Sequence, residues 1–294
     1  MSTSTATRPA APAEDGDPAG GGSPGGAARV GRAVLAVLSR SWLVVLVLVA
    51  WEAVTVAVDD HFFPPPSQIA VRMYELWFSG PASSAFLTQE ALDHFVPGIG
   101  RLLLGWALAA VVGVVLGVAL GRSELLHDLL DPLLQFFRAI PPPALLPVFL
   151  ILFSIGPRMQ LATIVFGIIW PILLNTMDGA RSVDRLHLDT ARVFGLSAPR
   201  RLVRIILPSA APKIFAGLRI SLAMALILMV ISELVGATNG IGYLMQTAQF
   251  GFDYQAVWGA VIVLGVLGNV LNLLFTLVER QVLGWQHGAR QLNS

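Results

Sequence analysis

The chain has 294 residues, of which 55% are hydrophobic and only 13% are charged, and its net charge is +1. Soluble globular domains carry about 25% charged residues, so most of this chain is expected to lie in lipid. The near-neutral charge gives no sign of a nucleic-acid partner. The sequence has no cysteine, which excludes disulfides, thiolate nucleophiles and cysteine metal sites.

Residues 1–28 are rich in Ala, Gly, Pro, Ser and Thr and contain no Val, Leu or Ile. Such a segment cannot bury enough apolar surface to offset the entropy lost on ordering, so we expect a disordered tail. It lacks a basic start that leads directly into an apolar core, and no small-residue cleavage site follows the first long apolar run. These features argue against a signal peptide.

Six apolar segments follow the tail, near residues 34–58, 98–121, 143–156, 160–177, 214–237 and 256–278. Crossing a bilayer as a helix takes about 20 residues. The third segment is short and begins in a proline cluster, so it spans only with part of that cluster or with a tilt. Helices are expected because only helices and closed barrels satisfy every backbone group in lipid. The predicted fold class is all-α, a polytopic membrane protein with six transmembrane helices.

Basic residues are distributed unequally between alternate loops, and this distribution predicts the orientation. One set of segments outside the spans holds Arg29, Arg32, Arg40, Arg122, Arg138, Arg181, Arg185, Arg192, Arg200, Arg201, Arg204, Lys213, Arg280 and Arg290. The alternate loops hold only Arg72, Arg101 and Arg158. By the positive-inside rule, both termini and the loop of residues 178–213 lie in the cytoplasm.

The loop of residues 178–213 is longer than a connection between two spans requires. Its first part reads as a short helix in which Asp189 is spaced to pair with Arg185 and Arg192. A less charged face of this helix, available to a partner, holds Leu186, Thr190 and Val193. A basic loop at the membrane surface without any partner is the alternative that the pattern alone leaves open.

The second part of this loop reads as another short helix. Gly195 is suited to the left-handed conformation that ends the first helix. Ser197 is a candidate N-cap and Pro199 fits the first turn of the second helix. Pro208 is expected to end that helix, because the residue before a proline disfavours the helical conformation. The prediction is a helix, a glycine turn and a helix beneath the membrane.

The spacing of this loop resembles a known motif. Asp189-Thr190-Ala191 is followed after three residues by Gly195 and after nine more by Ile205-Ile206-Leu207-Pro208. This arrangement is similar to the EAA loop of bacterial ABC importer permeases, which reads Glu-Ala-Ala, three residues, Gly, nine residues and Ile-x-Leu-Pro. Asp for Glu and Thr for Ala are mild departures. The resemblance implies a coupling helix that docks on an ATPase subunit through Asp189, Thr190, Ala191, Gly195, Ile205, Leu207 and Pro208.

The resemblance covers about residues 42–285 and is closest to the permeases for aliphatic sulfonates, taurine and nitrate. The segments that carry it include Phe63-Pro64-Pro65-Pro66-Ser67, Arg138-Ala139-Ile140-Pro141, Gly217-Leu218-Arg219, Glu233-Leu234 and Gly240-Ile241-Gly242-Tyr243. It implies a type I (MetI-like) importer core in a bacterial inner membrane and a small solute of one of these types. Related permeases move thiamine or riboflavin precursors, so that solute class is an alternative.

The resemblance also implies an organisation and a set of partners. We expect a cytoplasmic tail (1–28), a first transmembrane helix (29–58), an extracytoplasmic loop (59–97), a five-helix permease core (98–285) and a cytoplasmic tail (286–294). The expected partners are two ABC ATPase subunits, a second permease copy in a homodimer, an extracytoplasmic solute-binding protein and membrane lipid, with no nucleic acid.

Polar residues within the predicted spans are candidates for a gate or pathway. They are Glu233 and Ser232 near the outer end of the fifth span, and Asn269 and Asn272 one turn apart in the last. A carboxylate within a membrane is a functional candidate. Glu233 is hypothesised to form the outer gate by bonding a backbone amide in the turn of residues 236–242, with a structural cap as the alternative. Gly113, Gly117 and Gly121 form a small-residue stripe that favours close helix packing.

Several enzyme signatures are absent. The sequence contains no G-x-x-x-x-G-K-[ST], so the chain is not itself the ATPase. It also lacks H-E-x-x-H and G-x-S-x-G, and its five histidines are scattered outside the predicted spans. We therefore predict a non-catalytic permease subunit with no catalytic residue, metal or cofactor. An ATP-independent channel and a membrane enzyme are the alternatives from other classes.

Overall fold

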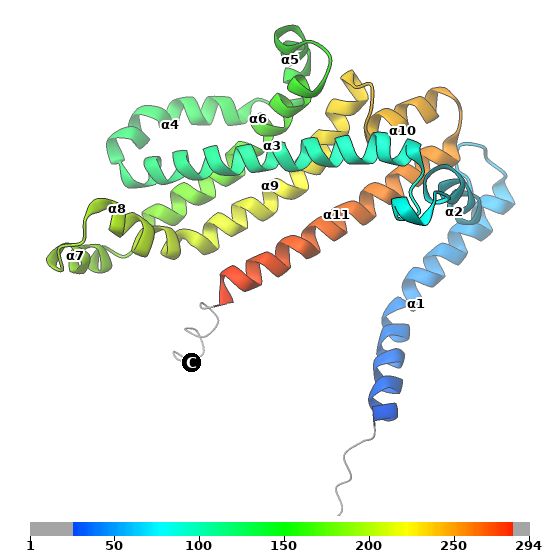
Figure 1. Ribbon diagram of the computed structural model, residues 1–294, viewed down its shortest axis with the longest axis horizontal. Coiled ribbons are helices and arrows are strands. Elements are labelled where there is room, and N and C mark those ends of the chain that lie inside the picture. Colours follow the sequence, from blue (N-terminus) through cyan, green and yellow to red (C-terminus); the bar gives the residue numbers. More distant parts are fainter. Residues whose placement is uncertain (1–25, 285–294) are drawn as a thin grey trace, which may run out of the picture. The chain divides into compact units, whose positions relative to one another are not determined.

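The computed structural model describes residues 26–284, and the side chains from Trp42 onward. Within this range every regular element is a helix. The chain divides into two units at Val54 and Thr55. The first unit contributes most of helix α1 (Gly26–Val58), and all other elements belong to the second (Figure 1). The predicted C-terminal tail (286–294) and residues 1–25 of the predicted N-terminal tail lie outside the described residues. Residues 26–28, also predicted as tail, form the start of α1.

Outside the loop that follows α6, the described part of the second unit contains eight helices of at least eight residues, if α4 and α5 are counted separately. They are α2 (Pro66–Met73), α3 (Gln89–Arg122), α4 (Glu124–Ala139), α5 (Leu146–Phe153), α6 (Pro157–Arg181), α9 (Leu207–Gly236), α10 (Ile241–Phe250) and α11 (Tyr254–Val282). Short turns of other helical types occur at Tyr74–Phe78, Ala82–Ser84 and Pro142–Leu145. The loop after α6 holds α7 (Arg185–Val193), α8 (Ala198–Arg201) and a π-helical turn, Leu202–Ile206.

Helices α3, α6 and α9 form the centre of the second unit, and glycines allow their close approach. A Cβ atom at Gly113 would lie 2.9 Å from the Ile172 side chain, and one at Gly117 would lie 2.7 Å from the Leu173 carbonyl oxygen. Side chains of Ile164, Ile168 and Ile172 on α6 are fully buried in this core. The predicted glycine stripe is thus confirmed as a packing surface between α3 and α6.

Four helical segments are long and apolar enough to cross a membrane: Ala82–Arg122, Pro157–Arg181, Ala198–Gly236 and Tyr254–Val282. They correspond to the second, fourth, fifth and sixth predicted spans, and the fifth ends one residue earlier than predicted, at Gly236. The first predicted span falls within α1, whose described side chains form a shorter apolar helix, Trp42–Val58. The all-helical, polytopic character predicted from the sequence is confirmed.

The third predicted span differs from a simple crossing helix. Its apolar run forms α5, which has only eight residues and a length of about 12 Å, too short to cross a bilayer of about 30 Å. Helix α5 and the preceding α4 pass as a membrane-crossing pair only together, and they are bent by 85° at the proline cluster. Prolines without an N–H and with a restricted φ angle explain the break.

The second helix of the loop after α6 does not end at Pro208, so that prediction was wrong. The chain continues from α8 through the π-helical turn Leu202–Ile206 into α9, with Pro208 in the first turn of α9. A π turn is wider than an α turn, and the Leu207 N–H donates to the Leu202 carbonyl oxygen five residues back. This wider turn gives the proline ring room that a regular helix lacks.

Candidate functional site

Helix α7 is bounded at both ends by local hydrogen bonds. At its start, the Asp184 side chain accepts a hydrogen bond from the Leu186 N–H at 2.9 Å, the usual role of an N-cap. At its end, Gly195 has a φ of +70°. The Leu196 N–H donates to the Ala191 carbonyl oxygen at 3.0 Å, and the Gly195 N–H donates to that of Arg192 at 2.9 Å. These two bonds form a Schellman motif, so the predicted left-handed helix end at Gly195 is confirmed.

One face of α7 packs against its own chain and another is free. Leu188 and Ala191 are buried, and Leu188 belongs to a small core with Ala180, Val183 and Ile206. Leu186 is 69% exposed and Val193 is 86% exposed, and the neighbouring Phe194 is also exposed. An exposed apolar face of this kind is typical of a binding surface. The less charged face predicted from Leu186, Thr190 and Val193 therefore lies on the surface of the described chain.

Five of the seven residues assigned to coupling line two hollows beside α7, whereas Gly195 and Leu207, the first residue of α9, line neither. Thr190, Ala191, Ile205 and Pro208 line one groove of about 490 Å³. Asp189 lies in a second cleft and pairs with Arg192 at 2.8 Å. Among the described residues no ion pair joins Asp189 to Arg185, so only one of the two predicted pairings forms.

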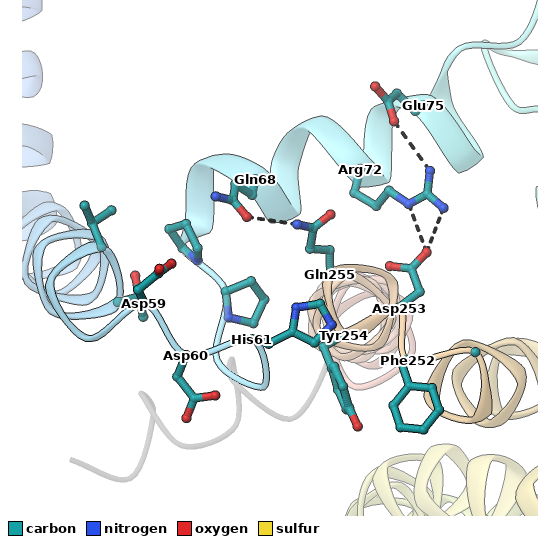
Figure 2. Close-up of a pocket in the computed structure, with 15 residues that line it drawn as sticks. Asp59, Asp60, His61, Gln68, Arg72, Glu75, Phe252, Asp253, Tyr254 and Gln255 are labelled. Atoms are coloured by element: carbon teal, nitrogen blue, oxygen red, sulfur yellow. Dashed lines mark hydrogen bonds and ion pairs between the residues drawn. The ribbon is translucent and has the colours of Figure 1, made fainter.

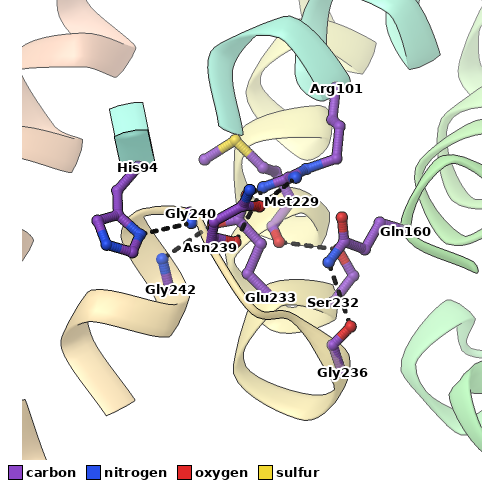
Figure 3. Close-up of polar contacts among 10 residues, drawn as sticks. All are labelled: His94, Arg101, Gln160, Met229, Ser232, Glu233, Gly236, Asn239, Gly240 and Gly242. Atoms are coloured by element: carbon purple, nitrogen blue, oxygen red, sulfur yellow. Dashed lines mark hydrogen bonds and ion pairs between the residues drawn. The ribbon is translucent and has the colours of Figure 1, made fainter. Parts of the chain in front are cut away.

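A cluster of buried polar groups lies at the opposite end of the central helices, where α9 ends (Figure 3). Glu233 on α9 is completely buried, and Arg101 on α3 is 8% exposed. The Arg101 Nη2 donates to Glu233 Oε1 at 2.7 Å. The other carboxylate oxygen, Oε2, accepts a hydrogen bond from the Gly242 N–H at 2.9 Å. The predicted bond between Glu233 and a backbone amide of the following turn is therefore present in the structure.

The same arginine also holds the turn between α9 and α10. Its Nη1 donates to Asn239 Oδ1 at 2.7 Å, and its Nη2 donates to the Asn239 carbonyl oxygen at 3.1 Å. The Gly240 N–H donates to His94 Nδ1 at 3.1 Å. Gly240 has a φ of +123°, and a Cβ atom there would lie only 2.2 Å from the Glu233 carboxyl carbon. A glycine is required at this position for both its conformation and its contact.

Sequence reasoning missed Arg101, which was counted among the residues of the alternate loops. The structure places it inside a membrane-crossing helix, 132 residues away in sequence from its partner. A usable signal was present: an arginine and a glutamate near the same end of two spans are expected to pair, because an unpaired charge in lipid is costly.

The other gate candidates lie in different surroundings. The Ser232 hydroxyl is buried and donates to the Met229 carbonyl oxygen of its own helix at 2.8 Å. Asn269 and Asn272 are exposed on α11, and neither amide side chain has a hydrogen-bond partner among the described residues. The structure therefore does not bring the asparagines together with Glu233 and Ser232.

A polar cleft of about 770 Å³ opens beside α2 and the start of α11 (Figure 2). Arg72 joins these two helices, since its Nε and Nη2 atoms donate to Asp253 Oδ2 at 3.0 and 2.7 Å. Asp253 also caps α11 by accepting from the Ala256 N–H at 3.0 Å. The hydrogen bond to Asp253 raises the pKa of Arg72, so this arginine stays charged. Gln68 and Gln255 form a further link at 2.8 Å.

Comparison with known proteins identifies the family. Residues 109–284 match the model of the binding-protein-dependent transport system inner membrane component. The chain belongs to this family. It is a multi-pass inner-membrane permease subunit of an ABC importer, a non-catalytic component that works with a separate ATPase and a binding protein. The predicted family and the predicted role as a non-catalytic permease subunit are confirmed.

Curated relatives extend the match over most of the chain. The taurine transport system permease protein TauC of Escherichia coli is 31% identical over 86% of this chain and 91% of its own length. The putative aliphatic sulfonates transport permease protein SsuC of Bacillus subtilis is 30% identical over 82% and 85%. The nitrate import permease protein NrtB of Synechocystis is 30% identical over 84% and 89%.

The fold also resembles a solved structure. A chain of the MetNI methionine ABC transporter in an inward-facing conformation superposes with a TM-score of 0.58. The match covers 65% of this chain and 95% of that one at 17% sequence identity. The permease therefore shares the MetI-like fold predicted for it.

Proposed function

We propose that this permease imports a small solute with an oxyanion group, of the aliphatic sulfonate, taurine or nitrate type. The support is that relatives named for these three solutes each match more than four fifths of the chain. A thiamine or riboflavin precursor, or another small organic solute, is the alternative within the family. Uptake by the reconstituted importer, with its own binding protein, distinguishes them. Transport of such a precursor and of none of the three oxyanions would contradict the proposal.

We further propose that α7 couples ATP hydrolysis to transport. The observation that carries this proposal is the exposed apolar face of α7, which ends at the left-handed Gly195. Two ATPase subunits would bind the paired α7 helices of a permease homodimer. Closure of the ATPases on ATP would then move the helices from an inward-open to an outward-open arrangement, and the energy comes from contacts that differ between these two states.

The proposed coupling role of α7 implies an orientation of the permease in the membrane. Both termini and the loop of residues 178–213 are placed in the cytoplasm, and the cleft of Figure 2 then opens toward the solute-binding protein. Within that arrangement, Arg101 and Glu233 hold the turn at the outer end of α9. We take their role in gating to be indirect: they fix the position of this turn, while Glu233 itself stays enclosed within one subunit.

A pair of substitutions at Gly195 tests the coupling role. Gly195→Val places a β-branched side chain at a φ of +70°, although no atom lies within 4 Å of the new Cβ. Its cost is therefore conformational, about 1–2 kcal/mol, and falls on the end of α7. Gly195→Asn is the matched control because Asn tolerates this conformation.

We expect the valine variant to insert normally but to lose co-purification with the ATPase, while the asparagine variant retains it. Asp189→Arg, which replaces the acid of the motif and breaks the pair with Arg192, is expected to weaken the same association. Normal ATPase binding and transport by both the valine and the arginine variants would exclude coupling through α7. Substrate flux in liposomes without ATP or ATPase would instead favour a channel, and conversion of the solute would favour a membrane enzyme.

A further inference from the structure

A second cleft, of about 750 Å³, lies where the C-terminal ends of α3 and α6 meet α7. We refer to it as the arginine cleft because four arginines line it: Arg122, Arg181, Arg185 and Arg192. Three separate elements supply them, so the cleft depends on the tertiary structure and is not a property of one helix. Figure 1 shows α7 at the same end of the second unit as the last turns of α3 and α6.

The charges in the arginine cleft do not cancel. Only two carboxylates, Glu124 and Asp189, line it with the four arginines, which leaves a net charge of +2. Asp189 pairs with Arg192, and Arg122 donates to the Ala180 carbonyl oxygen at 3.3 Å. Among the described residues, Arg181 has neither an ion pair nor a side-chain hydrogen bond. The C-terminal dipoles of α3 and α6 offset about half an elementary charge each, so an uncompensated positive charge remains.

The position of the cleft determines which anions can reach it. Arg122 and Arg181 lie in the last turns of two helices long and apolar enough to cross a membrane, and the ends of such helices are expected at the depth of the lipid headgroups. Helix α4 begins at Glu124, with one residue between it and the end of α3, and none of its side chains is buried. Leu125 is 78% exposed, and Leu129 on the next turn is also exposed. The cleft therefore combines a cationic hollow with an adjoining apolar surface.

We propose that the arginine cleft binds the phosphate group of an anionic phospholipid, whose acyl chains lie along the exposed leucines of α4. Arginine suits this ligand because its guanidinium group forms paired hydrogen bonds with phosphate oxygens. Basic pockets between membrane helices on the cytoplasmic side bind anionic headgroups. A free phosphate ion offers the same oxygen acceptors but makes no use of the apolar surface. Assignment of the cleft to the inner leaflet rests on the proposed orientation, whereas binding itself does not.

The test compares lipids that differ in headgroup charge. The purified full-length permease is titrated in detergent with short-chain phosphatidylglycerol or phosphatidylcholine, with binding measured by native mass spectrometry. The test variant is Arg122→Gln/Arg181→Gln, which leaves the proposed coupling residues intact. The control is Arg138→Gln/Arg200→Gln, which removes the same charge from two exposed arginines outside the cleft. In a detergent micelle both ends of the permease are accessible to added lipid, so the outcome does not depend on its orientation or on transport.

Wild-type protein and the control are expected to bind phosphatidylglycerol in preference to phosphatidylcholine. Loss of two arginines should weaken phosphatidylglycerol binding about 25-fold, from about fivefold for each residue at a membrane surface. Equal binding of the two lipids, or equal losses in the test and control variants, would overturn the proposal.

Two further measurements separate other ligands. Inorganic phosphate that binds to wild-type protein and is lost in the test variant, without a preference for phosphatidylglycerol, would assign the cleft to a soluble anion and overturn the lipid proposal. If the test variant loses ATPase co-purification and keeps lipid preference, the arginines belong to the ATPase interface. Loss of lipid preference with intact ATPase binding supports the proposal and leaves the coupling assignment standing.

Discussion

The ion pair between Arg101 and Glu233 makes a prediction that separates the energy of a buried charge from that of its hydrogen bonds. The carboxylate is fully buried, and the guanidinium is almost so. We consider four variants: Glu233→Gln, Glu233→Leu, Arg101→Leu and the double variant with leucine at both positions.

The expected magnitudes follow from the contacts. Glu233→Leu leaves the Arg101 charge without its carboxylate, at a cost of about 3–5 kcal/mol. It also leaves the Gly242 N–H without an acceptor, at a further cost of about 1–3 kcal/mol. Arg101→Leu leaves the buried carboxylate without its cation, with only backbone N–H groups as donors, and should also cost about 3–5 kcal/mol. Glu233→Gln keeps one acceptor oxygen but turns its NH2 group toward the other donor, so it loses one of the two hydrogen bonds to the carboxylate. It should cost less than the leucine variant, about 1.5–3 kcal/mol.

The double variant carries the decisive comparison. With both charges removed, only the hydrogen bonds to Gly242 and Asn239 are lost, so its destabilisation should be smaller than the sum of the two single losses by about 3 kcal/mol or more. Unfolding free energies are measured for purified protein in mixed micelles with increasing SDS, followed by tryptophan fluorescence. Transport by the reconstituted importer is measured in parallel.

If the pair fixes the turn after α9, transport should fall in step with stability: glutamine partially active, and both single leucine variants inactive. An inactive Glu233→Leu variant with unchanged stability would instead support direct participation of the carboxylate in the gate. Additive losses in the double variant would refute the reasoning from a buried ion pair. Normal stability and transport of Glu233→Leu would exclude both roles.

Two other predictions test packing and topology. Gly117→Leu should destabilise the protein by about 1–3 kcal/mol through overpacking, because the new Cβ would lie 2.7 Å from the Leu173 carbonyl oxygen. The control Gly265→Ala meets no atom within 4 Å and should be neutral or slightly stabilising. Equal effects of the two substitutions on unfolding in mixed micelles would contradict the packing argument. Reporter fusions at positions 70 and 250 should report an extracytoplasmic location and those at 130, 195 and 288 a cytoplasmic one, and a cytoplasmic signal at 250 would overturn the six-span topology.

Much of the fold could be predicted from the sequence, because in a membrane the helical conformation of a segment is determined by its own apolar residues. Lipid offers no hydrogen bonds to the backbone, so each long apolar run must be helical wherever it lies in the bundle. The Gly195 turn could also be predicted, since a left-handed residue at a helix end depends on the local chain. The glycine stripe on α3 pointed to close packing for the same reason, although not to its partner α6.

Only the tertiary structure decided how distant parts of the chain meet. The sequence places Arg101 and Glu233 near the ends of two spans, but only the packing of α3 and α9 in one unit brings the two side chains within hydrogen-bond distance. Pro208 continues a helix because a π turn precedes it, and the break at the proline cluster bends α4 and α5 by 85°. The arginine cleft likewise exists only where three elements converge. Hydropathy and local turn chemistry thus determined the elements, whereas buried charge pairs and shared clefts depend on distances between residues far apart in sequence.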